Sequence, residues 1–191
     1  EIELPKGHLW KAARAINSKG AEFTANMPTE EVYTLPHKNG INGRVYSTKP
    51  LNYNSNIIDE FYLDFKDGKV IGFDAKKGKE ILKTLIDTDQ GSKSLGEVAL
   101  VPHDSPISNT NLMFYETLYD ENASCHLAIG AAYPTCIENG VNMSDEELEK
   151  SGVNISLTHV DFMIGDATLN ILGIKENGEE VQVFKNGNWA F

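Results

Sequence analysis

A histidine and an aspartate two residues apart, His159 and Asp161, stand in the apolar segment THVDFMIG. If residues 155–164 form a β-strand, its two-residue period places these side chains on one face and Val160 and Phe162 on the other. An imidazole and a carboxylate held on a rigid strand could bind a divalent metal such as zinc. The pair could also be a structural histidine hydrogen-bonded to its neighbour. The spacing alone leaves both interpretations open.

A second histidine, His126, lies in the apolar run CHLAIG. A buried imidazole needs a partner, which could be a backbone carbonyl or a metal ion. The preceding Cys125 suggests a thiol nucleophile, but adjacent residues of a strand face opposite ways and make a poor nucleophile–base pair. We therefore expect Cys125 and Cys136, the two cysteines of the chain, to be small core residues.

Two glutamates complete the candidate set, Glu31 in NMPTEEV and Glu97 in GEVALVP. Glu97 precedes four apolar residues, so its carboxylate is expected at the mouth of a strand, where solvent meets the core. Either residue could be an ordinary surface acid, because a net charge of -11 supplies many carboxylates by chance. Glu30, next to Glu31, is the expected bystander.

The elements that would position these residues are mostly strands. Asp67-Gly68 lies between apolar runs in residues 61–74 and predicts a β-hairpin, and a helix is expected from Lys79 to Asp87. Residues 96–102 predict a short strand. Ser144 and Glu147 have the spacing of a capping box, which predicts a helix over DEELEK. After residue 164, successive strands are expected to meet at Asn177-Gly178 and Asn186-Gly187. The sequence thus predicts an α+β fold, a β-rich domain of mixed, mostly antiparallel sheet with a few short helices.

Length, charge and cysteine content limit the number of domains, the classes of binding partner and the compartment. The 191 residues are enough for one domain with its own core, so residues 1–191 are expected to form a single domain. The acidic charge argues against binding nucleic acid or an anionic membrane. No apolar run approaches the roughly 20 residues of a spanning helix, and EIELPKGH does not resemble a signal peptide. With only two cysteines, the chain is expected in the cytoplasm. It begins without Met, which suggests a fragment of a longer protein.

Four segments resemble the aminopeptidase T and aminopeptidase S family of metalloaminopeptidases in this order: NMPTEEV, GEVALVPHDSPI, FYETLYDENASCHLAIGAAYP and SLTHVDFMIG. The resemblance extends from about residue 21 to the C-terminus, and residues 8–20 are the least similar part. It implies the C-terminal, catalytic domain of a protein about twice as long, with the N-terminal domain absent from this chain. It also implies removal of N-terminal residues from peptides, with two divalent ions, zinc or cobalt, as cofactors.

The resemblance carries a metal site onto this sequence. Its members are Glu31, Glu97, His126, Tyr133, His159 and Asp161. At least one carboxylate should bridge the ions, and Glu97 and Asp161 are the expected bridges because both would project from strands. Catalytic roles fall on Glu97 and on Tyr133, which would be a weak ligand or a hydrogen-bond donor to the tetrahedral intermediate.

Two alternatives stay open beside this function. A truncated catalytic domain could keep its fold and ligand residues and act only as a β-rich binding or assembly domain. A cysteine hydrolase using Cys125 would resist chelation and be inactivated by thiol reagents. For the peptidase, the wall that selects a free amino terminus is expected from the absent N-terminal domain or from the partner in a homodimer.

Overall fold

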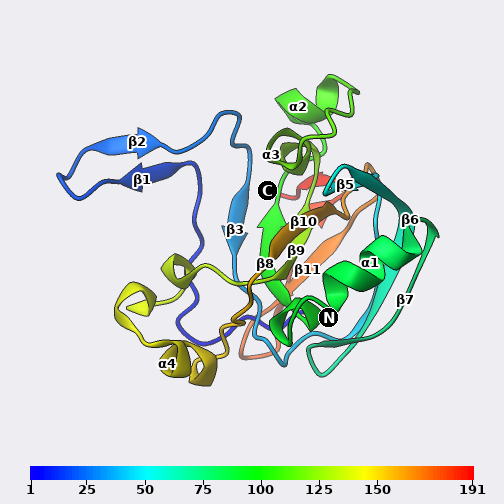
Figure 1. Ribbon diagram of the computed structural model, residues 1–191. Coiled ribbons are helices and arrows are strands. Elements are labelled where there is room, and N and C mark those ends of the chain that lie inside the picture. The colour runs from blue at the N-terminus through cyan, green and yellow to red at the C-terminus, as the bar shows by residue number, and fades with distance from the viewer.

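The computed structural model describes residues 1–191 and consists of several short sheets joined by loops and few helices (Figure 1). Every ladder between strands is antiparallel, so the predicted fold class is confirmed. The strands are β1 (Arg14–Ile16), β2 (Glu22–Thr24), β3 (Val32–Thr34), β4 (Gly43–Tyr46), β5 (Leu51–Tyr53), β6 (Asn56–Lys66), β7 (Lys69–Lys77), β8 (Leu95–Leu100), β9 (His126–Gly130), β10 (His159–Met163), β11 (Ile171–Ile174), β12 (Glu180–Lys185) and β13 (Asn188–Trp189).

The helices are short. They are α1 (Lys79–Ile86), α2 (Pro106–Asn109), α3 (Thr117–Asp120) and α4 (Asp145–Lys150), with 3₁₀ turns η1 (Gly91–Lys93), η2 (Glu121–Ala123), η3 (Pro134–Cys136) and η4 (Gly140–Asn142). None is long and apolar enough to cross a membrane.

A four-stranded sheet in the order β10-β9-β8-β3, which we call the site sheet, lies at the centre of the molecule (Figure 1). Alternate apolar residues of its strands, such as Leu127, Ile129 and Phe162, point to one face and join the main core. That core also contains buried residues of β6 and α1, and the Phe61 and Phe162 rings lie 5.5 Å apart within it. One face of the site sheet is therefore buried by packing, and the opposite face is left for polar side chains.

The local signals in the sequence lead to the expected elements. β6 and β7 form the hairpin around Asp67-Gly68, and Gly68 is required there because a Cβ would lie 1.8 Å from the Lys38 carbonyl oxygen. The helix α1 follows and buries its apolar stripe against the hairpin. Helix α4 begins at Ser144 with the predicted capping box to Glu147. All three predictions are confirmed.

The strand predicted over residues 155–164 is shorter than expected, because β10 begins only at His159. The residues before it are held by side chains instead of a neighbouring strand. Ser156 donates its hydroxyl to the Asp89 carboxylate, and that carboxylate accepts the Leu157 N–H at 2.6 Å. These bonds satisfy the backbone of a loop, so pairing with β9 starts two residues before Asp161.

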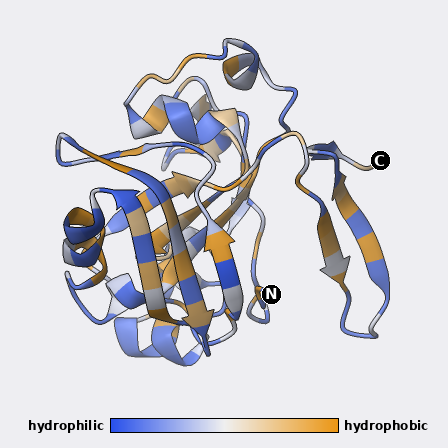
Figure 2. Ribbon diagram, turned by 90° about the vertical axis from the view of Figure 1, so that its right-hand side faces the viewer, coloured by the Kyte–Doolittle hydropathy of each residue, from blue (hydrophilic) through white to orange (hydrophobic).

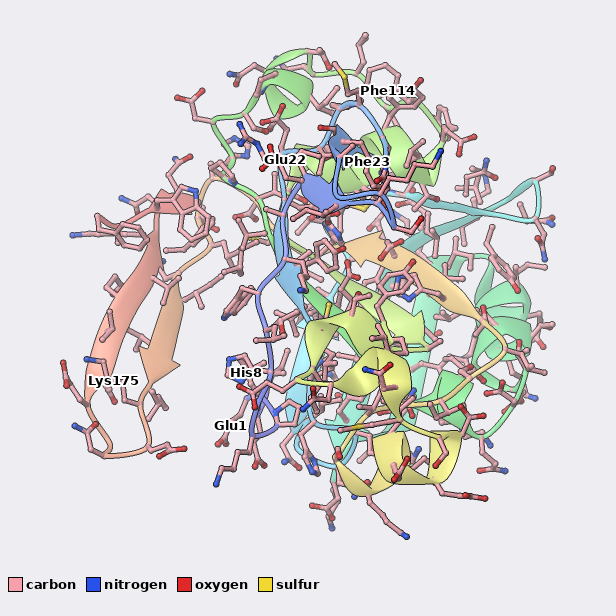
Figure 3. All side chains as sticks on the ribbon, turned by 90° about the vertical axis from the view of Figure 1, so that its left-hand side faces the viewer. Glu1, His8, Glu22, Phe23, Phe114 and Lys175 are labelled. Carbon is pink, nitrogen blue, oxygen red and sulfur yellow. The ribbon has the colours of Figure 1, made fainter.

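Two projections leave the body of the molecule. The β1–β2 hairpin, residues 14–24, forms an arm at the left of Figure 1, and β11–β13 form a separate small sheet that stands apart in Figure 2. Figure 3 shows Phe23 on the arm and Lys175 near the tip of the small sheet, well separated from each other. Phe23 is half exposed, and an isolated two-stranded hairpin is only marginally stable in water.

Candidate metal centre

The register of the site sheet brings two carboxylates and a histidine to one face. Glu97 of β8 and Asp161 of β10 both pair with Ala128 of β9, so the three side chains point to the same side. His126 lies two residues before Ala128 on β9 and shares that face, which we call the site face. Since the central residue is an alanine, the polar side chains around it have room to converge.

A bulge makes the position of Glu97 possible. The pairing of β8 with β9 shifts between Leu95 and Glu97. A Cβ on the intervening Gly96 would lie 2.1 Å from the Ala131 carbonyl oxygen, so only glycine fits at this close approach. Glu97 therefore lies inside a strand and is only 5% exposed. The expectation that its carboxylate lies at the mouth of a strand, where solvent meets the core, was wrong, because β8 begins two residues earlier, at Leu95.

The two histidines are oriented by backbone carbonyls. Nδ1 of His159 lies 2.7 Å from the Ala131 carbonyl oxygen, and Nδ1 of His126 lies 3.2 Å from that of Ser124. A carbonyl can only accept, so each Nδ1 carries a proton, and each ring presents the lone pair of Nε2 to the site once that nitrogen has lost its proton to make way for a cation. His159 is the first residue of β10, two residues before Asp161 and on the same face.

These side chains form two clusters of possible ligand atoms that overlap at Glu97. One cluster contains Glu31, Glu97 and His126, and the other contains Glu97, His159 and Asp161, with the atoms of each within 4.8 Å of one another. Glu97 directs Oε1 to within 3.5 Å of His126 Nε2 and Oε2 to within 3.8 Å of His159 Nε2. One carboxylate thus faces both clusters with a different oxygen, which is the arrangement of a bridging ligand.

Three atoms of the clusters have no hydrogen-bond partner although they are buried: Glu31 Oε2, His126 Nε2 and Asp161 Oδ1. Glu31 Oε2 and His126 Nε2 lie 3.0 Å apart, but without the geometry of a hydrogen bond. Burying an unpaired polar atom is costly, and such atoms are rare in native proteins. Oxygen and nitrogen donors converging in this way are the ligands that zinc and similar divalent cations use. The residues present therefore fit a metal.

The electrostatics of the site favour binding of a cation. Burial would lower the pKa of His159, but its polar contact with Asp161 and the charges of Asp161 and Glu97 outweigh burial and raise that pKa to about 9. The pKa of His126 is likewise raised well above its usual value by Glu31 and Glu97, against the effect of burial. Burial also raises the pKa of Glu97. The histidines and Glu97 therefore hold protons in the metal-free chain, and a bound cation would displace these protons.

Tyr133 lies beside the clusters on the loop after β9. Its ring centroid is 4.6 Å from that of His159, and the side chain is 46% exposed. Burial and the charges of Glu97 and Asp161 raise the pKa of its hydroxyl to about 12, so the phenol keeps its proton at neutral pH. A protonated hydroxyl at this place can donate a hydrogen bond.

Sequence reasoning missed one carboxylate, Glu121 in the turn η2. Burial and the charges of Asp161, His126, Glu31 and Glu97 act on it and raise its pKa to about 8. It therefore lies in the electric field of the clusters. The segment YDENASCH offered a weak signal, since Glu121 precedes His126 by five residues at the entry to the same strand. No local pattern distinguishes it from the other acids of that segment.

The two cysteines and Glu30 do not belong to the ligand clusters. Both cysteines are unpaired and buried. Cys125 packs with Leu100 and Phe184 in a small separate core, and burial raises the pKa of its thiol, which opposes use as a nucleophile. Glu30 contributes its backbone N–H to the Asn122 side-chain oxygen, 2.6 Å away.

A comparison of neighbouring glutamates tests the assignment of Glu31. We expect Glu31→Gln to weaken metal binding by more than about 100-fold, beyond the usual cost of disturbing residues around a ligand. Glu30→Gln is the matched control and should change the metal affinity by less than about twofold, because adjacent side chains cannot face the same ions. Metal titration of the two variants measures both effects. Equal damage from both substitutions would contradict the placement of the ligand.

Comparison with known proteins identifies relatives along the entire chain. A profile of the thermophilic metalloprotease family M29 matches residues 1–189. The chain is 60% identical to aminopeptidase 2 of Geobacillus stearothermophilus, 58% identical to aminopeptidase AmpS of Bacillus subtilis and 41% identical to aminopeptidase T of Thermus aquaticus. The solved structure of wild-type AmpT from Thermus thermophilus matches with a TM-score of 0.94 at 39% identity, over 100% of this chain and 47% of that one.

The coverage of these matches has two consequences. Each alignment with the three named relatives covers at least 99% of this chain but 46% of the relative, so the chain spans about half the length of the curated proteins it matches. The similarity also reaches the N-terminal residues, including the arm. The expectation that it begins near residue 21 was therefore too narrow.

Proposed function

Because the chain belongs to the M29 family of metalloproteases, we propose that it is the dinuclear metal-binding part of an aminopeptidase that removes N-terminal residues from peptides. The observation that carries this proposal is the pair of ligand clusters sharing Glu97. We further propose that residues 1–191 form the C-terminal catalytic domain of a longer chain. The relatives are about twice as long as the part that this chain matches, which supports a longer chain.

The donor atoms divide between two cations. Glu31 and His126 would hold one, His159 and Asp161 would hold the other, and Glu97 would bridge them. Carboxylate oxygens with imidazole nitrogens suit zinc or cobalt. Asp161, expected as a second possible bridge, belongs to only one of the clusters. Glu121 belongs to neither cluster of ligand atoms, although the charges of the clusters raise its pKa.

The reaction needs an activated water, a polarised carbonyl and stabilisation of the oxyanion formed when water adds. Two bound divalent cations would supply the water activation and the polarisation. They would also bind the neutral free amine of the substrate. Among the chain's own groups, Tyr133 donates a hydrogen bond from its phenolic hydroxyl to the oxyanion.

The same proposal includes a compartment and an assembly. Two unpaired thiols support the cytoplasm. A homodimer would cover exposed apolar side chains of the arm, namely Ile16 and Phe23. Light scattering on the full-length protein measures the assembly directly, and a monomer at micromolar concentration would contradict the dimer.

Enzyme assays test the function itself. The full-length protein should hydrolyse aminoacyl reporters with a free amino group, lose that activity with a chelator, and regain it with zinc or cobalt. Reporters with an acetylated amino group should be inert, because acetylation removes the basic lone pair of the amine. Activity that survives chelation and disappears with a thiol reagent would instead support a cysteine hydrolase.

The raised pKa values predict how stability depends on pH. His159 has a pKa near 9 when folded, so its stabilising protonation is complete below about pH 6.5, the unfolded value, and is lost as pH rises through 9. Glu121 has a pKa of about 8 when folded, so its carboxyl also loses a stabilising proton as pH rises to about 8. We expect the metal-free protein to lose on the order of 3 kcal/mol of unfolding free energy between pH 6.5 and 9.

Denaturant unfolding at both pH values measures this change, with and without chelator. With saturating zinc the trend should reverse, because the cation replaces the protons. The variant His159→Gln should show a weaker pH dependence than the unaltered metal-free protein, and the part that remains comes from His126 and Glu121. A metal-free stability that is flat or rises over this range would contradict the assigned pKa shifts.

A further inference from the structure

A second tyrosine, Tyr33, shares the site face although the proposed reaction does not use it. Tyr33 of β3 pairs with Ala99 of β8, and Ala99 pairs with His126 of β9. Directly paired residues of neighbouring strands point to the same side, so Tyr33 lies in one row with a proposed ligand. It also follows Glu31 by two residues along the chain.

Tyr33 is anchored on the protein side. Its ring packs against the second buried core, which contains Ala132 and Cys136 among other residues. Its backbone is fixed from both directions, since its N–H donates to the Lys11 carbonyl at 2.9 Å and its carbonyl accepts the Lys11 N–H at 2.8 Å. The position of this ring is therefore set by the fold.

Tyr133 has a weaker backbone anchor, a single hydrogen bond in which its carbonyl accepts the Cys136 N–H at 2.9 Å. It stands in a loop between β9 and η3, nearly half exposed, and its hydroxyl makes no hydrogen bond within the chain. The ring contacts are what define its position. On one side it packs on the imidazole of His159, which Ala131 holds, and on the other it meets the ring of Tyr33 edge-on, at 6.4 Å and 70°.

We propose that Tyr33 is a positioning residue whose ring holds Tyr133 against His159, so that the Tyr133 hydroxyl points at the reacting carbonyl. The inference rests on the proposed role of Tyr133 as a hydrogen-bond donor. An edge-on contact between two aromatic rings is favourable beyond the burial of their surfaces, so it can select one orientation of an exposed ring. Tyr33 acts through its ring, and its own hydroxyl is dispensable.

Kinetics of the full-length protein separate this role from a structural one. Tyr133→Phe removes the donor and should lower kcat by about 100-fold, the scale of one oxyanion contact. Tyr33→Ala and Tyr33→Leu should each lower kcat by about tenfold, the rate equivalent of an aromatic pair of about 1.4 kcal/mol, with KM and metal content nearly unchanged. Tyr33→Phe keeps the ring and should stay within about twofold of the unaltered protein, because it retains the edge-on contact. The leucine variant keeps apolar volume against the second core if the alanine variant is unstable.

The decisive comparison is the double variant of Tyr33→Leu and Tyr133→Phe. If Tyr33 acts through Tyr133, the double variant should be no slower than Tyr133→Phe alone. Additive losses would overturn the inference while leaving the proposed function intact, and so would a Tyr33→Phe variant as slow as Tyr33→Leu. A silent Tyr133→Phe would remove the donor role and this inference together. Absence of metal-dependent activity in the unaltered protein would contradict the proposed function itself.

A second readout does not depend on activity. In the metal-free protein the ring current of Tyr133, whose ring centroid lies 4.6 Å from that of His159, should shift the His159 ring protons in NMR spectra. Tyr33→Leu should reduce that shift by more than half, and Tyr33→Phe should preserve it. An unchanged shift in Tyr33→Leu would show that Tyr133 holds its place without Tyr33 and would overturn the inference.

Discussion

Replacing Glu97 by glutamine is expected to remove both metal ions and to lower activity by more than about 1,000-fold. The amide keeps the shape of the side chain but loses the charge that faces His126 through one oxygen and His159 through the other. Loss of a bridge weakens both clusters at once, and the metal ions are worth several kcal/mol of transition-state stabilisation. Metal analysis after dialysis and reporter turnover measure the two effects.

Substitutions in a single cluster provide the contrast. His159→Ala and Asp161→Ala should also abolish activity, but each should leave close to one tightly bound ion, held by Glu31, His126 and the bridge. Glu30→Gln should retain both ions. If Glu97→Gln kept full metal content, or if His159→Ala or Asp161→Ala remained fully active, the two-cluster assignment would be wrong.

The 191-residue chain on its own is expected to fold and bind metal, yet to turn over aminoacyl reporters at least about 100-fold more slowly than the full-length protein. Its cores and all proposed ligands lie within the chain. The side of the site that bears Tyr133 is open to solvent, however, because this side chain is 46% exposed. A wall is needed there to position the substrate amine, and misplacement by about 1 Å costs roughly two orders of magnitude in rate.

Parallel assays of the two proteins with saturating zinc or cobalt measure this difference. Circular dichroism of the short chain confirms that low turnover does not reflect unfolding. Turnover of the short chain within a few fold of the full-length protein would show that the catalytic domain needs no further wall.

Local signals in the sequence predicted most of the fold. Asp67-Gly68 identified the hairpin and Ser144 with Glu147 identified the start of α4, because each depends on residues close in the chain. The strand over residues 155–164 was predicted too long, since the bonds of residues 156 and 157 to Asp89 are long-range. The two-residue period still placed His159 and Asp161 together correctly, because both lie within β10.

Less of the candidate site could be predicted from the residues alone. The sequence suggested that His159 and Asp161 share a face, but Glu97 joins them only through the register of three strands and the bulge at Gly96. Glu31 and Glu97 entered the candidate set chiefly through the resemblance to a family. Glu121 was missed because a turn, not a strand period, brings it to the site, and Tyr33 was missed because its row is set by pairing between distant strands.

The number of metal ions bound per chain tests the central claim most directly. All proposed ligands lie between Glu31 and Asp161, so the 191-residue chain can be measured after equilibration with excess zinc or cobalt and removal of free metal. Two overlapping clusters predict close to two ions per chain, and close to one for His159→Ala. No bound ion under these conditions would contradict a metal centre and would favour a β-rich binding or assembly domain that does not catalyse.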